Sequence, residues 1–397
     1  MASAFGGHQL VSKVVCGFRA AFIATAWLVL SACAALAQFE TKAARAFMID
    51  AETGTILYAK DPDVRFTPAS LAKLMTAEIV FDALKAGRLS RDTTFQVSEH
   101  AWRTGGAPSR TATMFAAVKS FVPLGDLIQG AVVITANDAC IVMAEGMSGS
   151  EAKFTERMNE RAKELGLAKS VFVNPTGLPA DGQSVTARDL VTLARHIWQT
   201  YPEFYPLFAQ SEYKWNNINQ QNRNPLIKLG IGADGLATGF AEEAGFGIVA
   251  SAAGDGKRLF LAMSGLATEK ERVDEARRLI EWGMRAFRKI EIFAADETVG
   301  EAKTFGGEKS RVKLSAHGAV SMLVPAENRD KVIARIVYEG PVEAPVQVGQ
   351  PVGKLKIWVG DMLTQETPLY AAEAVGVGSL SQRTLDAIEE LAIGWLR

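Results

Sequence analysis

Ser70 and Lys73 lie three residues apart in the segment FTPASLAK, which spans residues 66–73. Apolar residues recur at helical spacing from Leu71 onward, so we predict a helix that is capped by Thr67 and runs to about Lys85. Side chains three residues apart lie on the same face of a helix, and the serine hydroxyl would therefore meet a primary amine. A desolvated amine gives up its proton readily and can then act as a general base toward serine. The pair is a candidate for nucleophilic catalysis, although Ser-x-x-Lys is also common by chance.

The composition is typical of a globular protein and offers no attraction to nucleic acid. The chain has 397 residues, of which 48% are hydrophobic, and this predicts one large core and a second smaller one. The 43 basic and 44 acidic residues give a net charge of −1, and no basic run is interleaved with aromatic residues. Nucleic acid is therefore not an expected partner.

The N-terminus has the pattern of an export signal. A weakly basic lead precedes the almost wholly apolar residues 20–37, which end in the small-x-small tripeptide Ala-Leu-Ala. Cleavage before Gln38 would release an exported mature chain, and the shortness of the apolar stretch argues against a retained membrane helix. Lipoprotein processing at Cys33 is a second interpretation, because residues 30–33 also resemble the corresponding processing site.

Cysteine and histidine chemistry is not expected in the mature chain. Export would remove Cys16 and Cys33, which leaves only Cys140, in an apolar helix where buried and inert thiols are usual. The four histidines are scattered singly, and none forms a pair with the spacing of metal ligands. We therefore expect no disulfide, no metal and no cysteine nucleophile.

The first part of the mature chain has the pattern of a mixed α and β domain. Residues 46–59 read as a strand, a glycine-containing turn and a second strand, and residues 123–193 are mainly helical. Residues 102–110 contain glycine and proline and are expected to form a loop. A Gly-rich strand over residues 229–239 precedes a hairpin over residues 247–263 that turns at Asp-Gly.

The sequence changes in character after Lys289. Short alternating segments separated by Pro, Gly, Asn and Glu predict a small all-β sandwich over residues 290–380. Residues 381–397 predict an amphipathic helix with Leu385 and Ile388 on its apolar face. Two interpretations of this helix stay open, an anchor lying in a membrane interface and a terminal helix docked on its own domain. Its polar face carries acidic residues, which weakens attraction to anionic lipid.

Two further motifs supply what Ser-x-x-Lys alone lacks. Acyl transfer from a serine also needs groups that relay protons and groups that hold the substrate and its oxyanion. The sequence has Thr135-Ala136-Asn137 after an apolar helix and Ala237-Thr238-Gly239 on the Gly-rich strand. These motifs, in this order, are similar to the triplet Ser-x-x-Lys, Ser-x-Asn and Lys-Thr-Gly of penicillin-binding proteins and serine β-lactamases.

Longer segments around the motifs resemble the D-alanyl-D-alanine carboxypeptidases, the low-molecular-mass penicillin-binding proteins of the bacterial periplasm. The segments are TANDAC at 135–140, MAEG at 143–146, FVNPTGL at 172–178 and GADGLATG at 232–239. The resemblance covers essentially the whole mature chain and implies an α+β fold. The expected parts are a signal peptide (1–37), a penicillin-binding/β-lactamase-like catalytic domain with an antiparallel sheet and helices (38–289), a small all-β sandwich (290–380) and a C-terminal amphipathic helix (381–397).

The resemblance also implies a role for each matched residue. Ser70 would attack the carbonyl between the last two D-alanines of a peptidoglycan stem peptide, with Lys73 as its base. The backbone amides of Ser70 and of the strand at Thr238 and Gly239 would stabilise the oxyanion. Asn137 would hold Lys73 and the peptide carbonyl of the substrate. Water would then hydrolyse the acyl-enzyme without a metal or organic cofactor, and β-lactams would inhibit by acylating the same serine.

The sequence departs from the family pattern at two positions. Thr135 stands where the family has serine; threonine keeps a hydroxyl for proton relay, but its extra methyl group restricts χ1. Ala237 replaces the lysine of Lys-Thr-Gly and removes a positive charge beside the terminal carboxylate of the substrate. Losing a charge-assisted bond of about 1.5–3 kcal/mol predicts a rate loss of about tenfold or more. Thr238 remains available to the carboxylate, and Arg110, in a loop expected to flank the cleft, is a candidate replacement cation.

The favoured function is therefore a serine-type D-alanyl-D-alanine carboxypeptidase that acts on peptidoglycan stem peptides in the periplasm. Contact with the inner membrane through the C-terminal helix is left open. The alternative is a peptidoglycan-binding or regulatory homologue with negligible turnover, which Ala237 and Thr135 motivate. A β-lactamase is the least favoured function, because those enzymes lack the β-rich second domain.

Overall fold

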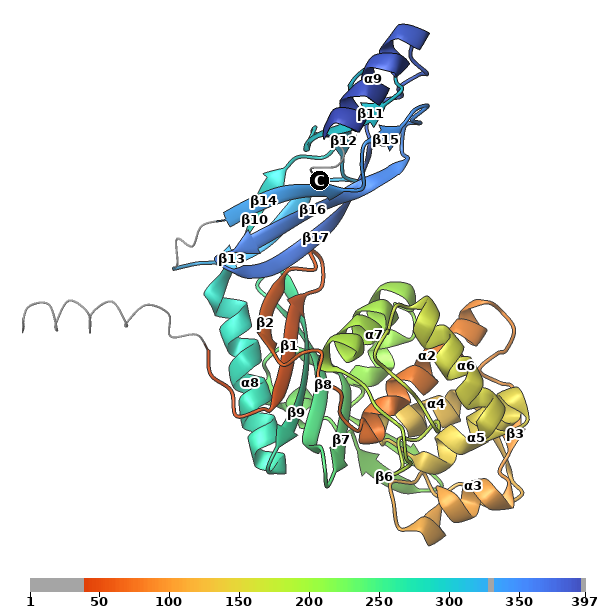
Figure 1. Cartoon of the computed structure of the whole chain (residues 1–397). Coiled ribbons are helices and arrows are strands. Elements are labelled where there is room, and N and C mark those ends of the chain that lie inside the picture. The colour runs from red at the N-terminus through yellow and green to blue at the C-terminus, as the bar shows by residue number, and fades with distance from the viewer. Residues whose placement is uncertain (1–38, 328–331, 394–397) are drawn as a thin grey trace, which may run out of the picture. The chain divides into compact units, whose positions relative to one another are not determined.

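The structure is a computed structural model that describes residues 39–327 and 332–393 (Figure 1). The expected signal peptide, its cleavage site and the alternative lipoprotein site at Cys33 lie outside the described residues. Residues 42–397 form one compact unit, and the description below concerns the described part of that unit.

An antiparallel five-stranded sheet forms the centre of the first part of the described chain. Its strands are β1 (Arg45–Asp50), β2 (Ile56–Lys60), β7 (Ala233–Ala241), β8 (Gly245–Gly254) and β9 (Lys257–Leu266). The strand order is β2-β1-β9-β8-β7, which leaves β7 at one edge. The two predicted hairpins, β1–β2 and β8–β9, are confirmed. The edge position of β7 leaves one side of the strand that carries Thr238 and Gly239 open to other groups.

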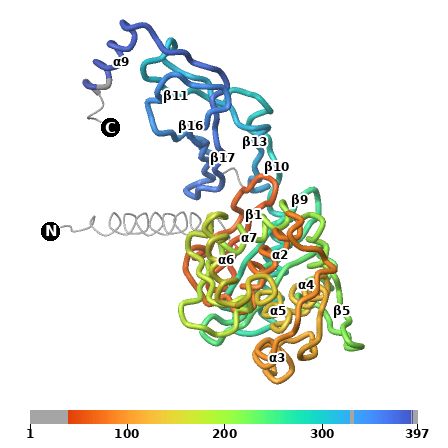
Figure 2. Tube along the Cα trace, turned by 90° about the vertical axis from the view of Figure 1, so that its right-hand side faces the viewer, coloured from red at the N-terminus to blue at the C-terminus, as the bar shows by residue number. Residues whose placement is uncertain are grey.

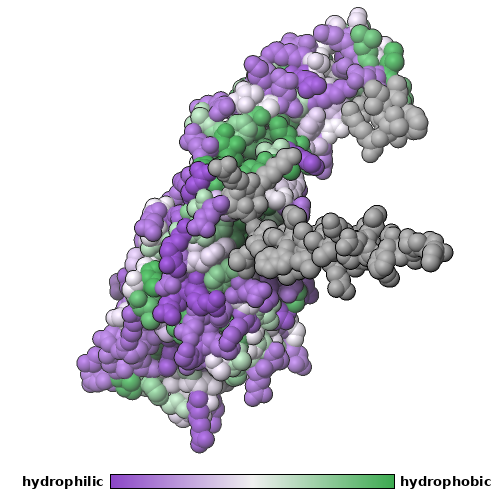
Figure 3. Space-filling model, turned by 90° about the vertical axis from the view of Figure 1, so that its left-hand side faces the viewer, coloured by the Kyte–Doolittle hydropathy of each residue, from purple (hydrophilic) through white to green (hydrophobic). Residues whose placement is uncertain are grey.

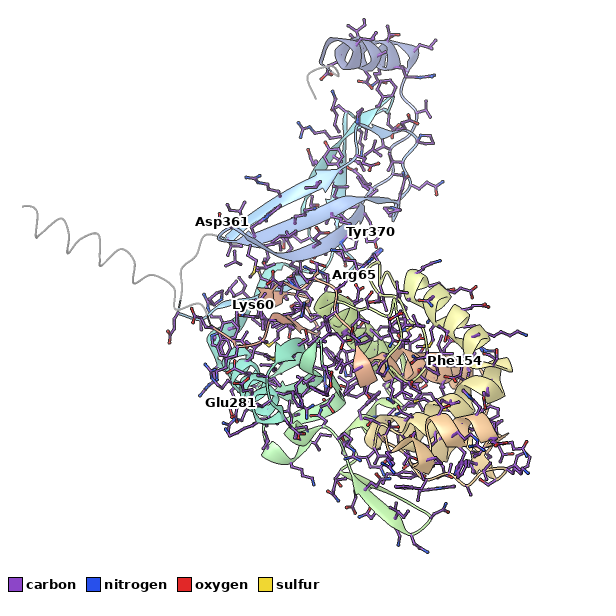
Figure 4. The ribbon with its side chains drawn as sticks, turned by 60° about the horizontal axis from the view of Figure 1, so that its bottom comes forward. Lys60, Arg65, Phe154, Glu281, Asp361 and Tyr370 are labelled. Atoms are coloured by element: carbon purple, nitrogen blue, oxygen red, sulfur yellow. The ribbon has the colours of Figure 1, made fainter. Side chains whose placement is uncertain are left out.

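Helices cover both faces of this sheet. In chain order they are η1 (Ala69–Ala72), α2 (Lys73–Lys85), α3 (Glu99–Thr104), η2 (Ala107–Ser109), α4 (Leu124–Val133), α5 (Asn137–Ser148), α6 (Glu151–Glu164), α7 (Ala187–Thr200), η3 (Tyr205–Ala209), η4 (Pro225–Leu229) and α8 (Glu269–Ala286). Figure 4 shows Glu281 on α8 and Phe154 on α6, on opposite sides of the sheet. The short strand pairs β3 (Thr94–Gln96) with β4 (Phe121–Pro123) and β5 (Glu212–Trp215) with β6 (Ile218–Gln221) lie between helices in the sequence.

The predicted loop over residues 102–110 is wrong in part. The first residues of that segment continue α3, which begins after Ser98, and the hydroxyl of Ser98 accepts a hydrogen bond from the amide of Ala101 at 2.9 Å. A serine that caps the first turn stabilises a short helix, and this signal outweighs the glycine and proline content that follows. Gly105 ends α3, and a β-carbon there would lie 2.4 Å from the backbone nitrogen of Asp138. The segment is therefore packed closely against the start of α5.

The helix α5 is buried among the other helices. Cys140 lies on it as a free and fully buried thiol, as we predicted. Burial raises the pKa of the Cys140 thiol to about 12, so it is neutral and unreactive at ordinary pH. Thr186 caps α7, since its hydroxyl accepts a hydrogen bond from the amide of Asp189 at 3.1 Å.

The C-terminal part of the chain is an all-β domain with its own core. Its strands are β10 (Phe287–Phe293), β11 (Gly300–Phe305), β12 (Arg311–Ser315), β13 (Val320–Pro325), β14 (Val332–Tyr338), β15 (Val342–Glu343), β16 (Pro351–Val359) and β17 (Met362–Ala371). β10 pairs with β13, and the other six form a sheet in the order β14-β16-β17-β12-β11-β15. The predicted β-rich region is thus confirmed. The expected boundary after residue 289 falls inside β10, so the division at that point stays a prediction.

The last described helix, α9 (Leu380–Ile393), lies beside β11 (Figures 1 and 2). Two of its acidic residues contact the domain: Glu389 pairs with Lys303 at 2.6 Å, and Asp386 accepts the backbone N–H of Gly306 at 2.7 Å. Its exposed apolar residues are Leu380, Leu385, Ile388 and Leu391. Apolar residues gather at this end of the molecule in the surface view (Figure 3). Every helix among the described residues is too short or too polar to span a bilayer.

Candidate active site

The structure brings the hydroxyl of Ser70 and the amine of Lys73 together. Ser70 lies on the 3-10 turn η1, and Lys73 is the first residue of α2. Lys73 Nζ lies 2.9 Å from Ser70 Oγ, a hydrogen-bonding distance. Because the three-residue spacing of a 3-10 turn stacks the two side chains, the contact is made without a bend in the helix.

The segment before Ser70 begins the helix differently from our prediction. We expected Thr67 to cap it, but Pro68 is the N-cap residue, and no side chain bonds to the first amides. Ala69 has a φ of +47°, the left-handed region that non-glycine residues rarely adopt. The chain therefore turns sharply one residue before the nucleophile, and the helix begins too late for Thr67 to reach it. Backbone strain of this kind is concentrated at functional sites.

Lys73 is held in a buried environment that favours its neutral form. The side chain is 4% exposed, and its amine donates a hydrogen bond to the carbonyl of Thr176 at 2.6 Å. Desolvation is the largest influence on this group and lowers the pKa of the Lys73 amine to about 8. With this pKa about a tenth of the amine is neutral at pH 7, far more than for an ordinary lysine, and a general base must be neutral to accept a proton.

Asn137 makes different contacts from those we expected. Its amide Nδ2 donates to Thr111 Oγ1 at 2.9 Å, and its backbone N–H donates to the carbonyl of Ala112 at 2.7 Å. The expected bond to Lys73 is not among its contacts; the amine of Lys73 instead contacts Ser70 Oγ and the carbonyl of Thr176. Asn137 Oδ1 is buried and has no hydrogen-bond partner within the described part of the chain. Such an atom costs about 1–3 kcal/mol, so a donor arriving with a substrate would be a favourable partner.

The loop over residues 113–116 is anchored to α5 by Asp138, which sequence reasoning missed. Its buried carboxylate accepts hydrogen bonds from the amides of Met114 and Ala116 and from the hydroxyl of Thr113. Burial raises the pKa of the Asp138 carboxyl, and these hydrogen bonds act in the opposite direction. The sequence offered one signal for this role, since Asp138 directly follows Asn137 of the second motif.

Thr135 occupies a strained backbone position at the same edge of the site. Its φ is +56°, and its side chain is 9% exposed. The left-handed conformation costs an ordinary residue about 1–2 kcal/mol, and a β-branched residue is among the least suited to it. The departure from serine therefore affects the backbone as well as the χ1 rotamer.

The third motif approaches Ser70 from the edge of the sheet. Gly239 lies against the start of η1, where a β-carbon would be 3.0 Å from the carbonyl oxygen of Pro68. The close approach of the two backbones accounts for the glycine. Thr238 is buried, and its hydroxyl donates to the carbonyl of Arg223 at 3.3 Å. Ala237 is also buried, on the neighbouring position of β7.

Arg223 is a cation beside the motif that sequence reasoning did not find. Its carbonyl accepts from Thr238, and its backbone N–H donates to the carbonyl of Val133, two residues before Thr135. Arg223 thus joins β7 to the segment that carries Thr135. Arg110, the cation suggested from the sequence, is exposed at the end of η2, and the next residue is the Thr111 that contacts Asn137. No cluster of His, Cys, Asp or Glu in residues 39–327 or 332–393 is arranged to hold a metal.

Comparison with known protein families identifies the family of this chain. A model described as "D-alanyl-D-alanine carboxypeptidase" matches residues 32–267, more than half of the chain. The chain belongs to the D-alanyl-D-alanine carboxypeptidase family. This confirms the family and the α+β fold that the sequence predicted. A second model, "Penicillin-binding protein 5, C-terminal domain", matches residues 287–377.

Members of this family are similar over most of their length. The carboxypeptidase DacD of Salmonella typhimurium is 33% identical over 348 residues, which cover 87% of this chain and 89% of that protein. The carboxypeptidase DacC of Escherichia coli is 33% identical over 349 residues and 87% of each chain. The structure of penicillin-binding protein 5 from Haemophilus influenzae has a TM-score of 0.74 at 31% identity, covering 86% of this chain and 99% of that one.

The family membership makes this chain a serine hydrolase with D-alanyl-D-alanine carboxypeptidase activity. The similarity extends through both domains, so it favours the enzyme over the alternative of a non-catalytic homologue. Penicillin-binding protein D2 of Listeria monocytogenes, solved with ampicillin bound, is 28% identical with a TM-score of 0.56 and covers 62% of this chain. Peptidoglycan and β-lactams are thus the two classes of ligand that the family implies.

Proposed function

We propose that this enzyme removes the terminal D-alanine from peptidoglycan stem peptides through an acyl-enzyme on Ser70. The observation that carries the proposal is the buried amine of Lys73, 2.9 Å from Ser70 Oγ, with a pKa lowered to about 8. A general base with a pKa near the working pH combines a large neutral fraction with a useful driving force for proton transfer.

The residues of the site supply each step of the reaction. Neutral Lys73 takes the proton of Ser70 as the oxygen attacks the carbonyl between the two D-alanines. Backbone amides of Ser70 and of β7 near Gly239 stabilise the oxyanion. Lys73 then gives the proton to the amine of the departing D-alanine, and the hydroxyl of Thr135 relays it. Water, activated by Lys73, hydrolyses the ester that remains.

The geometry supports a revised role for Asn137. Its Nδ2 is already bonded to Thr111, whereas its buried Oδ1 has no partner among the described residues. We therefore assign Oδ1 to an N–H of the substrate peptide, in place of the predicted hold on Lys73. A substrate N–H would remove the cost of the unsatisfied oxygen and so contribute to binding.

The terminal carboxylate of the substrate would be held by Thr238 and by the guanidinium of Arg223. Thr238 lies on the edge strand next to Ala237, and its hydroxyl contacts the backbone of Arg223. Arg223 is exposed, and its guanidinium makes one long, exposed hydrogen bond, to Gln220 Oε1 at 3.4 Å, which a substrate carboxylate would replace. A guanidinium presents paired donors to a carboxylate and can supply the charge that Ala237 lacks.

The decisive experiment measures D-alanine release from a pentapeptide by the mature chain, with Ser70→Ala as the control. A fluorescent penicillin reports acylation of Ser70 independently of turnover. We expect both labelling and release, and neither in the control. Labelling without release would favour a peptidoglycan-binding or regulatory role, and rapid hydrolysis of β-lactams would favour a β-lactamase.

Substitution at Ala237 tests how the missing charge is supplied. We expect Arg223→Ala to lower D-alanine release by about tenfold or more, since a charge-assisted bond is lost. Ala237→Lys should then restore most of that loss in the double variant, because the lysine charge returns to the strand. An Arg223→Ala enzyme that keeps full activity would show that another group holds the carboxylate.

We also propose that the chain is exported to the periplasm and contacts the inner membrane through α9. The division into a signal peptide (1–37), a catalytic domain (38–289), a β-sandwich (290–380) and a terminal helix (381–397) is part of this proposal. The inward-facing Asp386 and Glu389 support the membrane contact. Because these carboxylates are engaged with the β domain, they no longer oppose an approach of the apolar face to lipid.

A further inference from the structure

We propose that the turn at residues 174–178 positions both the nucleophile and its base, and that Asn174 is its central positioning residue. This inference rests on the proposed function of Ser70 and Lys73. The turn belongs to the FVNPTGL segment, which lies far from the other three motifs in the sequence. Its own side chains do not perform the chemistry, so the proposal concerns the geometry that the turn imposes.

The turn holds the base through main-chain oxygens. Lys73 Nζ donates to the carbonyl of Thr176 at 2.6 Å. One helical turn further along α2, the hydroxyl of Thr76 donates to the carbonyl of Pro175 at 2.7 Å. Thr76 is fully buried, and so is Thr176. Two successive carbonyls of the turn therefore fix the start of α2.

The same turn also rests on the backbone beside the nucleophile. Gly177 has a φ of +77°, and a β-carbon there would lie 1.7 Å from the carbonyl oxygen of Ala69. Ala69 is the residue with positive φ that precedes Ser70. The contact leaves no room for any side chain at Gly177. The turn thus touches the nucleophile segment and the base at once.

Asn174 determines the shape of the turn. Its Oδ1 accepts three hydrogen bonds, from the amide of Thr176 at 3.2 Å, the hydroxyl of Thr176 at 2.9 Å and the amide of Gly177 at 2.7 Å. Its Nδ2 donates to the carbonyl of Leu178 at 2.9 Å. A single side chain consequently orients the carbonyl that holds Lys73 and the glycine that contacts Ala69.

The bond to the carbonyl of Thr176 affects the reaction by orienting the amine of Lys73. A neutral amine has two N–H donors and one lone pair, and only the lone pair can accept the proton of Ser70. With one N–H engaged by the carbonyl of Thr176, rotation of the amine is restricted and the lone pair is available to Ser70 Oγ. A misplacement of about 1 Å between reacting groups can lower a rate by about a hundredfold.

The test measures acylation by a fluorescent penicillin at increasing concentration and at pH 9, where most of Lys73 is neutral. We expect Asn174→Ala to lower the limiting acylation rate constant by about tenfold or more. The apparent dissociation constant for the penicillin should change by less than about threefold, since the turn orients the reacting groups. Asn174→Asp keeps the accepting oxygen and should recover most of the rate.

Asn159→Ala is the matched control. Asn159 makes two hydrogen bonds that tie Phe172 in the adjoining segment to α6 and a third to the carbonyl of Thr155 within α6, and the described residues show none to Thr176. We expect it to lower thermal stability while the limiting rate constant stays as in the wild type. Equal rate losses in the Asn159 and Asn174 variants would overturn the proposal, because the effect would then be general loosening.

A second variant covers the case in which Asn174→Ala does not fold. Thr176→Val keeps the volume and the carbonyl but removes the hydroxyl that bonds to Asn174, and we expect a loss of several-fold in the same rate constant. A wild-type rate in this variant would overturn the positioning role. A wild-type enzyme that no penicillin acylates would instead contradict the proposed function, so the two failures are distinguishable.

Discussion

Lys73 is the residue whose surroundings do most to define the chemistry of the site. An ordinary lysine has a pKa near 10.4 and is almost fully protonated at neutral pH, so it cannot accept a proton from serine. Burial disfavours the charged form of Lys73 and lowers the pKa to about 8. The carbonyl of Thr176 then directs the amine without supplying a full counter-charge.

The lowered pKa predicts the pH dependence of acylation. Lys73 must be neutral to act as base, so the rate should rise with pH through a midpoint near 8 and level off above it. The measurement is the rate of labelling by a fluorescent penicillin between about pH 6 and pH 10. Lys73→Arg, which stays charged throughout, should show no labelling at any pH. A rate that is independent of pH would contradict the assignment of Lys73 as base.

Thr135 offers a second prediction at this scale, because its φ of +56° strains a β-branched residue. Thr135→Ser keeps the hydroxyl and removes the methyl group that crowds the backbone. We expect the free energy of unfolding to rise by about 0.5–1 kcal/mol and acylation to be at least as fast as in the wild type. Chemical denaturation and penicillin labelling measure the two effects. Slower acylation by the serine variant would show that the threonine methyl group has a role of its own.

Among the elements, α9 combines the two interpretations that the sequence left open. It is docked on its own domain through Asp386 and Glu389, and its apolar residues face outward. An amphipathic helix with a free apolar face is suited to a membrane interface. Asp386 and Glu389, two of the acidic residues that argued against lipid from the sequence, bind the domain.

The outward face of α9 predicts binding to lipid vesicles. Leu385 is 66% exposed, and burying a leucine in lipid contributes about 1.5–3 kcal/mol. We expect Leu385→Glu to weaken sedimentation of the mature chain with anionic vesicles by about tenfold or more. Val348→Glu, at another exposed apolar position (66%), is the matched control and should leave binding unchanged. Equal binding by both variants would exclude α9 as the contact.

Across the whole molecule, a buried polar contact joins the catalytic part to the β domain. Thr55 Oγ1 donates to Gln365 Oε1 at 2.9 Å and accepts from the amide of Leu323 at 3.1 Å. The two partners are separated from Thr55 by 310 and 268 residues. A buried hydroxyl that satisfies two partners links parts of the chain that have separate hydrophobic cores.

Removing that hydroxyl should destabilise the protein without altering the site. Thr55→Val keeps the shape but leaves Gln365 Oε1 without its donor and the amide of Leu323 without its acceptor. We expect the free energy of unfolding to fall by about 1–3 kcal/mol, while penicillin labelling of the folded enzyme is unchanged. Thr192→Val, which removes an exposed hydroxyl on α7, is the control and should have little effect. A loss of labelling in Thr55→Val would show that the junction affects the site.

Local sequence patterns were sufficient to predict much of this fold. Ser70 and Lys73 are close because they are three residues apart in a helical segment. The β8–β9 hairpin could be predicted because Asp and Gly tolerate the positive φ that a two-residue hairpin turn requires. The start of η1 was harder to predict, because the positive φ of Ala69 arises from packing against Gly177 and not from any preference of alanine.

The sequence by itself determined the family, the order of its two matched regions and the closeness of Ser70 to Lys73. Only the tertiary structure decided which groups surround them. The carbonyl of Thr176 lies 103 residues from Lys73 in the chain, and the backbone of Arg223 meets Thr238 only when β7 is in place. Every residue has a main-chain carbonyl, so the pattern of side chains in the sequence does not predict which carbonyl will contact Lys73 or Thr238. Burial, which lowers the pKa of Lys73, is likewise a property of the packed interior and not of lysine.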